Sequence, residues 1–138
     1  WQWHGYGNAW IVLDGAPVQS VSGGGHWGGG LFMNAYDMAR FGLLTVRKGN
    51  WNGKQIISEQ WIKQSVTPTT ANPGYGYMNY YLAGKEELPG APANAFMHVG
   101  NGVNAIYADP SNDLVIVMRW IENNAIDGMV KRVLEAIK

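Results

Sequence analysis

The spacing of apolar residues changes from a helical to a strand pattern at about residue 74, and this change limits the folds open to the chain. Two stretches before that point, 34–48 and 59–66, carry apolar residues at helical spacing. The runs after it are typical of strands and are 75–82, 95–100, 104–109 and 114–120. The last run is apolar throughout, as expected for a strand buried on both faces. The pattern predicts an α+β fold, an antiparallel sheet with flanking helices.

The segment before the first helix carries strand and turn signals. Residues Ala9–Leu13 and Pro17–Val21 flank Asp14-Gly15, which predicts a β-hairpin. Six glycines then fall in the nine residues 22–30, a density typical of backbone at positive φ or pressed close to another surface. A flexible linker is the alternative, but the bulky pair His26-Trp27 at its centre argues against one.

Local signals place the ends of the helices. Asn34 can cap a first helix, with Asp37 reaching back three residues later, and Gly49 can end that helix. Ser58 can cap a second helix, which Pro68 stops. A last helix is predicted to start at a capping Asp127 and to pack on the sheet through a stripe made of Met129, Val130, Val133, Leu134 and Ile137.

Composition excludes several functions. The chain has 138 residues, the size of one domain, and ten basic residues balance ten acidic ones. That balance argues against nucleic-acid binding, and no apolar run reaches the roughly 20 residues of a membrane span. The absence of cysteine removes thiolate nucleophiles and cysteine-bound metals. Seven Trp and seven Tyr leave a carbohydrate-binding module as an alternative to an enzyme.

The order of short motifs resembles the serine hydrolases of the class C beta-lactamase and penicillin-binding-protein type. Single motifs are weak, but the ordered series is specific and runs over nearly the whole chain. The series is Ser22-Gly23-Gly24-Gly25, Asp37-Met38-Ala39-Arg40-Phe41, Trp51-Asn52-Gly53-Lys54, Ser58, Tyr75-Gly76-Tyr77, His98-Val99-Gly100 and Asp109-Pro110 to Val117. Members use a Ser-x-x-Lys nucleophile, a Tyr-x-Asn base element and a third motif, Lys-Thr-Gly or His-x-Gly, on an edge strand.

The chain departs from that pattern at the nucleophile. No serine has a lysine three residues later, so residues 1–138 are expected to be a single partial domain, the C-terminal portion of such a fold. Its helical insert would span about 34–66, and its sheet and last helix about 74–138. The opening Trp1-Gln2-Trp3 also reads as a piece of something longer, with the nucleophile upstream. Two Tyr-x-Asn strings occur, at Tyr6 and Tyr77, but neither has the family's position relative to the Ser-Gly-Gly-Gly stretch.

The resemblance assigns roles to a few residues. His98, Gly100 and Asn101 would be catalytic: His98 replaces the family lysine, Gly100 lets substrate lie along the strand, and the Asn101 N–H forms half of the oxyanion hole. Val99, His26 and Trp27 would contact substrate. The structural alternatives are a packed strand histidine at 98 and an aromatic plug at His26-Trp27.

The resemblance also implies partners. The substrate would be a small ester, amide or lactam, with esters and peptides favoured because His98 replaces the lysine. The missing N-terminal part would complete the sheet, and a periplasmic or secreted location is favoured over a cytoplasmic one. No cofactor is expected, and His4, His26 and His98 lack metal-ligand spacing. A non-catalytic relative that keeps the fold as a binding scaffold is a further alternative.

Overall fold

The computed structural model describes residues 2–3, 10–13, 15–19, 31–77, 80–81, 88–100 and 102–138. The chain divides into two compact units, Trp1–Asp37 and Met38–Lys138, and each is described by itself. The glycine-rich run 22–30 and residues 82–87 lie outside the described residues.

The first unit contains two short antiparallel strand pairs. Strand β1 (Gln2–Trp3) pairs with β4 (Leu31–Phe32), and β2 (Trp10–Leu13) pairs with β3 (Ala16–Gln19). The turn between β2 and β3 contains Gly15 at φ +80°, a backbone angle that glycine adopts without a steric penalty. The predicted hairpin is therefore confirmed.

Helices α1 (Ala35–Val46) and α2 (Glu59–Ser65) begin where their capping residues predicted. Asn34 Oδ1 accepts the Asp37 N–H at 2.9 Å, and Asn34 Nδ2 donates to Asp37 Oδ2 at 2.9 Å. Asp37 thus reaches back to the capping side chain. Ser58 Oγ accepts the Trp61 N–H at 3.1 Å and caps α2. Each cap satisfies an amide that the first turn leaves without a helical partner.

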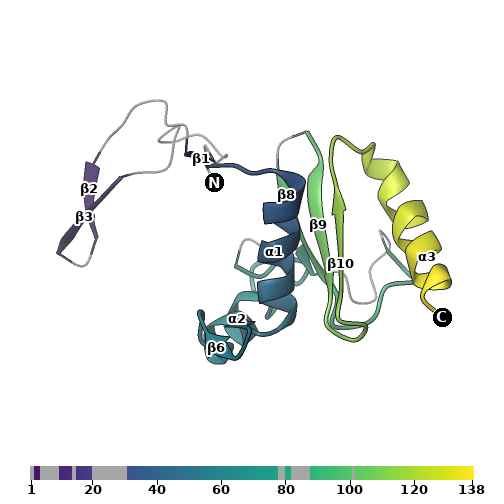
Figure 1. Ribbon diagram of the computed structural model, residues 1–138, viewed down its shortest axis with the longest axis horizontal. Helices are drawn as coiled ribbons and strands as arrows, with labels where there is room; N and C mark the ends of the chain where they lie inside the picture. The colour runs from purple at the N-terminus through teal and green to yellow at the C-terminus, as the bar shows by residue number, and fades with distance from the viewer. Residues whose placement is uncertain are drawn as a thin grey trace. The chain divides into compact units, whose positions relative to one another are not determined.

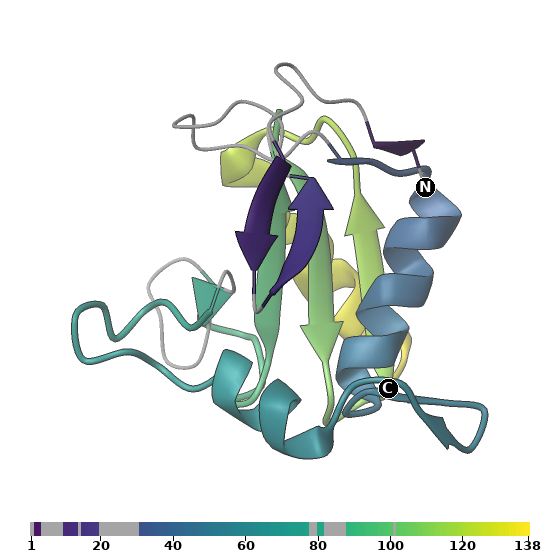
Figure 2. The ribbon, with the colours of Figure 1, turned by 90° about the vertical axis from the view of Figure 1, so that its left-hand side faces the viewer.

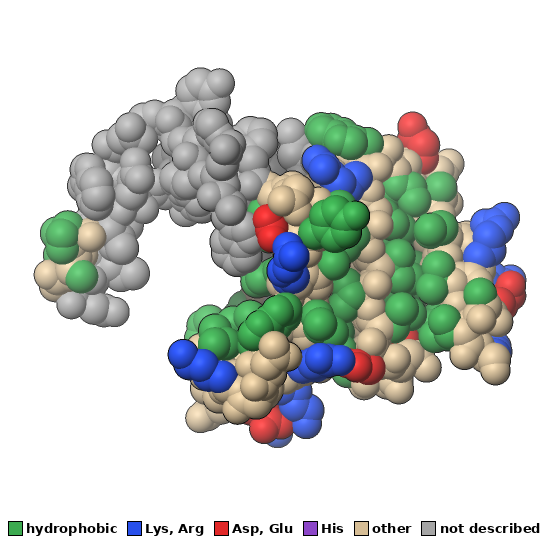
Figure 3. All heavy atoms as spheres, viewed as in Figure 1, with side chains coloured by type: hydrophobic (Ala, Val, Ile, Leu, Met, Phe, Trp, Pro, Cys, Tyr) green, Lys and Arg blue, Asp and Glu red, His purple; other side chains and the backbone are tan. Residues whose placement is uncertain are grey.

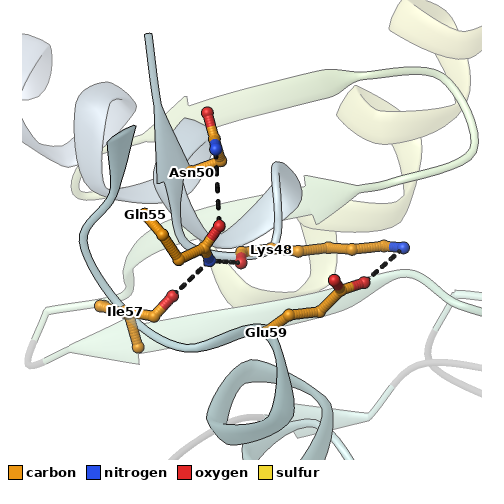
Figure 4. A network of polar contacts seen from close by, with 5 residues as sticks. All are labelled: Lys48, Asn50, Gln55, Ile57 and Glu59. Carbon is orange, nitrogen blue, oxygen red and sulfur yellow. Dashed lines mark hydrogen bonds and ion pairs between the residues drawn. The ribbon is translucent and has the colours of Figure 1, made fainter. Parts of the chain in front are cut away.

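The C-terminal end of α1 is held by a compact polar cluster (Figure 4). Lys48 and Gly49 both have positive φ, and the Gly49 N–H donates to the Leu44 carbonyl at 2.7 Å, as in a Schellman motif. Gln55 Nε2 donates to the carbonyls of Lys48 and Ile57. Two two-residue strands, β5 (Asn50–Trp51) and β6 (Lys54–Gln55), flank the turn. The predicted end of the helix at Gly49 is confirmed.

The second unit is built on a four-stranded antiparallel sheet of order β10-β9-β8-β7. Its strands are β7 (Tyr80–Tyr81), β8 (Phe96–Gly100), β9 (Asn104–Asp109) and β10 (Leu114–Met118). A 3-10 turn, η1 (Asn123–Ala125), leads into helix α3 (Ile126–Ala136). Helices α1 and α3 cover opposite faces of this sheet (Figures 1 and 2). The described residues thus form an α+β structure with three α-helices and antiparallel sheets.

Strand alternation divides the core between the two faces of the sheet. On the α3 side Met97, Tyr107 and Ile116 pack with Ile126 and Val130 of the helix. On the α1 side Phe96, Ala108 and Val46 form a second cluster, with Val115 packed against it. Helix α1 lies close to the strands because Gly42 has no side chain: a Cβ there would lie 2.6 Å from Val115 Cγ1 and 2.7 Å from Ile106 Cγ2.

The β9–β10 hairpin forms as predicted and is anchored by a buried carboxylate. Asp109 is fully buried, and its oxygens accept from the Ser111 N–H at 3.0 Å and from Asn112 Nδ2 at 2.7 Å. Across the same turn Arg47, the residue after α1, pairs with Asp113 at 2.8 Å. Asp109 and Asp113 are thus structural hairpin residues.

The predicted strand 75–82 is wrong over most of its described length. Only Tyr80–Tyr81 forms a strand, while Met78, Asn79 and Leu82 lie outside the described residues. The Tyr77 N–H donates to the Ser65 carbonyl at the end of α2, at 2.8 Å. That tertiary hydrogen bond takes the amide away from a strand ladder, and the sequence pattern does not show it.

Two further expectations at the C-terminal end need correction. Strand β10 ends at Met118, and only Ile116 and Met118 are buried, because β10 lies at the edge of the described sheet. Helix α3 begins at Ile126 without a side-chain cap, and Asp127 lies in its first turn. The buried stripe consists of Ile126 and Val130, whereas Met129 and Ile137 are 42% and 50% exposed.

Candidate functional site

Strand β8 carries the described part of the predicted site. His98 projects to the α1 side of the sheet, and Val99 packs against the core on the α3 side. Gly100 ends the strand and pairs with Asn104 of β9. Asn101, His26 and Trp27 lie outside the described residues, so their predicted roles remain predictions.

His98 lies between two aromatic rings. Its ring centroid is 5.1 Å from that of Phe41 on α1 and 5.5 Å from that of Phe96, both in edge-on geometry. Its Nε2 atom is buried and has no hydrogen-bond partner among the described residues. Burial disfavours the charged imidazolium and lowers the pKa of His98 to about 4. His98 is therefore a neutral imidazole at neutral pH, with one ring nitrogen available for a hydrogen bond.

Gly100 is a glycine that the described structure does not require. A Cβ at Gly100 would meet only the Asn104 carbonyl oxygen, at an ordinary contact distance of 3.7 Å, and its φ is not in the positive region. By contrast, a Cβ at Gly49 or Gly76 would lie 2.1 Å or 2.2 Å from a carbonyl oxygen. Close packing therefore explains why positions 49 and 76 are glycine. At Gly100 the described atoms at the end of β8 leave room for a side chain.

Among the described residues, the β7 side of β8 has a partner strand only at its first two residues. Strand β7 pairs with Phe96 and Met97, through Tyr81 and Tyr80. From His98 to Gly100 the described residues provide a ladder partner on the β9 side alone. Unpaired backbone groups at a strand edge are the usual acceptor of an added extended peptide.

An exposed tryptophan packs against the turn after β8, and the sequence pattern did not predict this contact. Trp120 follows β10, is 70% exposed, and lies over Gly102, where a Cβ would be 2.0 Å from its Cζ3 atom. The preceding Arg119 approaches Asn104 with Nε 3.5 Å from Oδ1. No local motif predicts that contact, since the indole and the glycine are far apart in the chain. The high number of tryptophans was the one sequence feature that could have indicated an exposed indole.

Other candidate residues lie elsewhere. Tyr77 is 52% exposed and packs against Trp61 at 5.8 Å between ring centroids, near the end of α2. A pocket on the α3 side of the sheet is lined by Ala91, Val130 and Leu134 among others, and by none of the predicted site residues. Within the residues that the structure describes, no group of His, Asp or Glu could hold a metal ion. No described helix is long and apolar enough to span a membrane.

Comparison with known proteins gives a likeness to a solved structure. No family model and no curated protein sequence matches the chain. Among solved structures it is similar to the "Putative 6-aminohexanoate-dimer hydrolase from Bacillus anthracis", with 27% sequence identity and a TM-score of 0.55. The match covers 79% of this chain and 29% of that protein, so the chain spans less than a third of its neighbour.

The likeness is to a solved structure with a beta-lactamase-like fold. The neighbour has a beta-lactamase-like fold, in agreement with the resemblance drawn from the ordered motifs. The agreement is one of fold at the level of the superfamily.

Proposed function

We propose that this chain is the C-terminal portion of a serine hydrolase that cleaves esters or amides through an acyl-serine intermediate. The observation that carries the proposal is Gly100, where a Cβ would make only an ordinary contact with described atoms, two residues after the half-buried, neutral His98 and its unpartnered, buried Nε2. The nucleophile and the base would come from residues upstream of this chain.

Gly100 would let the substrate lie along β8 as an added strand. From His98 to Gly100, the described residues pair with β8 on the β9 side alone, and the substrate would occupy the other side. A side chain at position 100 would project into the space that Gly100 leaves empty. Main-chain hydrogen bonds to the substrate would then position its carbonyl group at the nucleophile.

His98 would act as a neutral hydrogen-bonding group. A buried polar atom without a partner is costly, and such atoms concentrate at sites where a partner arrives on assembly or binding. The rings of Phe41 and Phe96 fix the imidazole, so Nε2 is pre-oriented. Its partner would be the base network or the substrate itself.

The reaction would proceed by two acyl transfers. The serine gives its proton to the base and bonds to the substrate carbonyl carbon, and the alcohol or amine departs with that proton. Water then cleaves the acyl-serine ester, which releases the acid and restores the serine hydroxyl. By the resemblance, the Asn101 N–H would stabilise the oxyanion in both steps.

The upstream part of the domain would also cover the sheet edge at β10. Hydrophobic side chains gather on the face that β10 and α3 present in Figure 3. Within the described sheet β10 has a partner strand on one side, β9. An exposed apolar edge is normally covered in a native protein, which supports completion of this sheet by further chain.

The same comparison supports a proposal about the substrate class. The solved neighbour is described as acting on a 6-aminohexanoate dimer, which is a linear amide. We propose that the substrate of this protein is also a linear amide or ester. The family lysine would favour the carboxylate of a lactam substrate, and in this chain His98 replaces that lysine.

A matched pair of glycine variants tests the proposal in the longer protein that would contain this chain. Gly100→Val should lower kcat/KM for a p-nitrophenyl ester by at least about tenfold, because the added side chain blocks substrate. Gly90→Val is the control, since a Cβ at Gly90 meets no atom within 4 Å, just as a Cβ at Gly100 makes no close contact, but Gly90 lies in a turn on the α3 side. Both variants should keep the thermal midpoint. Full activity of Gly100→Val would contradict the proposal.

A further inference from the structure

Trp120 occupies an unusual position at the end of the sheet. It is 70% exposed, although an indole is one of the side chains that gains most from burial. The indole ring packs against Gly102, where an added Cβ would lie 2.0 Å from Cζ3 and 2.4 Å from Cε3 of the ring. The glycine therefore makes room for the ring, which is held in place while much of it stays open to solvent.

The backbone under the ring is strained. Trp120 has φ +54° and Val103 has φ +52°, a region that is rare for bulky and β-branched residues. Gly102 lies beside them at φ +73°. Strained non-glycine residues that gather at one place often mark functional sites, where the surrounding structure holds them.

A cation lies next to the indole in the chain. Arg119 is exposed, and its Nε lies 3.5 Å from Asn104 Oδ1, at the residue that pairs with Gly100. Within the described residues Arg119 forms no ion pair, whereas Arg47 pairs with Asp113 and Lys48 pairs with Glu59. Its guanidinium is thus available to a carboxylate at the same end of β8.

We propose that Trp120 and Arg119 form a substrate subsite for an aliphatic segment that ends in a carboxylate. This inference rests on the proposed function, because it places the subsite at the turn that follows Gly100. Asn101 links Gly100 to Gly102, and consecutive Cα atoms are about 3.8 Å apart, so the indole lies within a few ångströms of that turn.

The two side chains supply complementary chemistry. The flat indole face offers apolar contact to a methylene chain at little cost in side-chain entropy. The planar guanidinium can donate two parallel hydrogen bonds to a carboxylate. The subsite therefore distinguishes a substrate with a terminal carboxylate from its neutral amide, through Arg119, while Trp120 binds both.

Fluorine NMR on the longer protein tests the subsite directly. The protein is labelled with 5-fluorotryptophan, and the Trp120 resonance is identified by its loss in Trp120→Phe. The probes are 6-acetamidohexanoate and its neutral analogue 6-acetamidohexanamide. We expect the Trp120 resonance to shift to saturation with both, and the carboxylate to bind about fivefold or more tightly than the amide.

Variants separate the two contributions. Arg119→Gln should make the two probes bind with equal affinity, and Trp120→Ala should weaken both by about fivefold. Arg132→Gln and Trp61→Ala are the matched controls, an exposed arginine on α3 and a half-exposed tryptophan on α2, and both should leave the two affinities unchanged.

The outcomes distinguish this inference from the proposed function. Hydrolysis of a p-nitrophenyl ester without any shift of the Trp120 resonance would overturn the subsite and leave the hydrolase standing. Saturable shifts without hydrolysis would support the subsite and count against the hydrolase. A Trp120 resonance without a solvent isotope shift, together with a lowered thermal midpoint in Trp120→Ala, would show that upstream chain buries the indole, and this result also overturns the subsite.

Discussion

His98 shows how a single residue acquires its properties from its neighbours. The sequence places it in a strand, but the rings of Phe41 and Phe96 determine that it is buried and neutral. The resemblance places His98 where the family has a lysine, so a positive charge would be allowed there. Desolvation disfavours that charge on the imidazole. A hydrogen-bonding role is the one that the described environment supports.

The pH dependence of stability tests this environment. Burial lowers the folded-state pKa of His98 to about 4, below the ordinary value of 6.5, so the unfolded chain binds more protons between these two values. The contribution of His98 is fully present above pH 6.5 and is lost as the pH falls toward 4, by up to about 3 kcal/mol. His98→Phe should remove this part of the acid sensitivity.

The measurement is the free energy of unfolding at pH 7 and pH 4.5 for the wild type and His98→Phe. The wild type should lose more stability than the variant on acidification, and the difference between the two losses isolates His98 from the other titrating groups. Equal losses would mean that the imidazole is not desolvated between the two rings.

The connection between α1 and α2 behaves as one structural element. Gly49 ends α1, receives the amides of Ile56 and Ile57 on its carbonyl, and leaves no room for a side chain, because a Cβ would lie 2.1 Å from the Ile57 oxygen. Gln55 joins the two sides of the turn through the Lys48 and Ile57 carbonyls. The position of α2 relative to α1 depends on this cluster.

Two glycines with the same backbone angle allow a controlled test of the cluster. Gly49 has φ +81° and Gly53 has φ +82°, but a Cβ at Gly53 meets no atom within 4 Å. Gly53→Ala should cost about 1 kcal/mol of unfolding free energy, the cost of a positive φ alone. Gly49→Ala should cost about 3 kcal/mol or more, because it adds a collision with backbone. Similar losses in chemical denaturation would show that the turn adapts freely.

Local signals predicted the elements whose causes are local. Asn34, Ser58 and Gly49 marked helix ends, and Asp109 marked the hairpin, because each acts on atoms within a few residues. The strand predicted at 75–82 was wrong at 75–77, where the Tyr77 amide bonds to Ser65, an interaction set by the packing of α2, and right at Tyr80–Tyr81.

The candidate site shows the same limit. The sequence identified the motif His98-Val99-Gly100, but the two phenyl rings and the contact of Trp120 with Gly102 depend on which face of the sheet meets α1 and where β10 ends. These are tertiary relations between segments far apart in the chain. Patterns of single residues do not encode them.

At the scale of the molecule, the described sheet has helices on both faces and an apolar side next to β10 (Figures 1 and 3). The solved neighbour is more than three times as long as the part that this chain matches. Both observations support an active site assembled from this chain and further residues, with β8 as one wall.

The most direct measurement is covalent labelling with a fluorophosphonate probe, followed by peptide mass mapping. It would be done on the 138-residue chain and on the longer protein that we propose contains it. We predict that the chain alone stays unlabelled, because none of its serines is followed by a lysine three residues later, and that the longer protein is labelled at the serine of an upstream Ser-x-x-Lys. Label within these residues, or a gene without such a motif upstream, would contradict the proposed serine hydrolase.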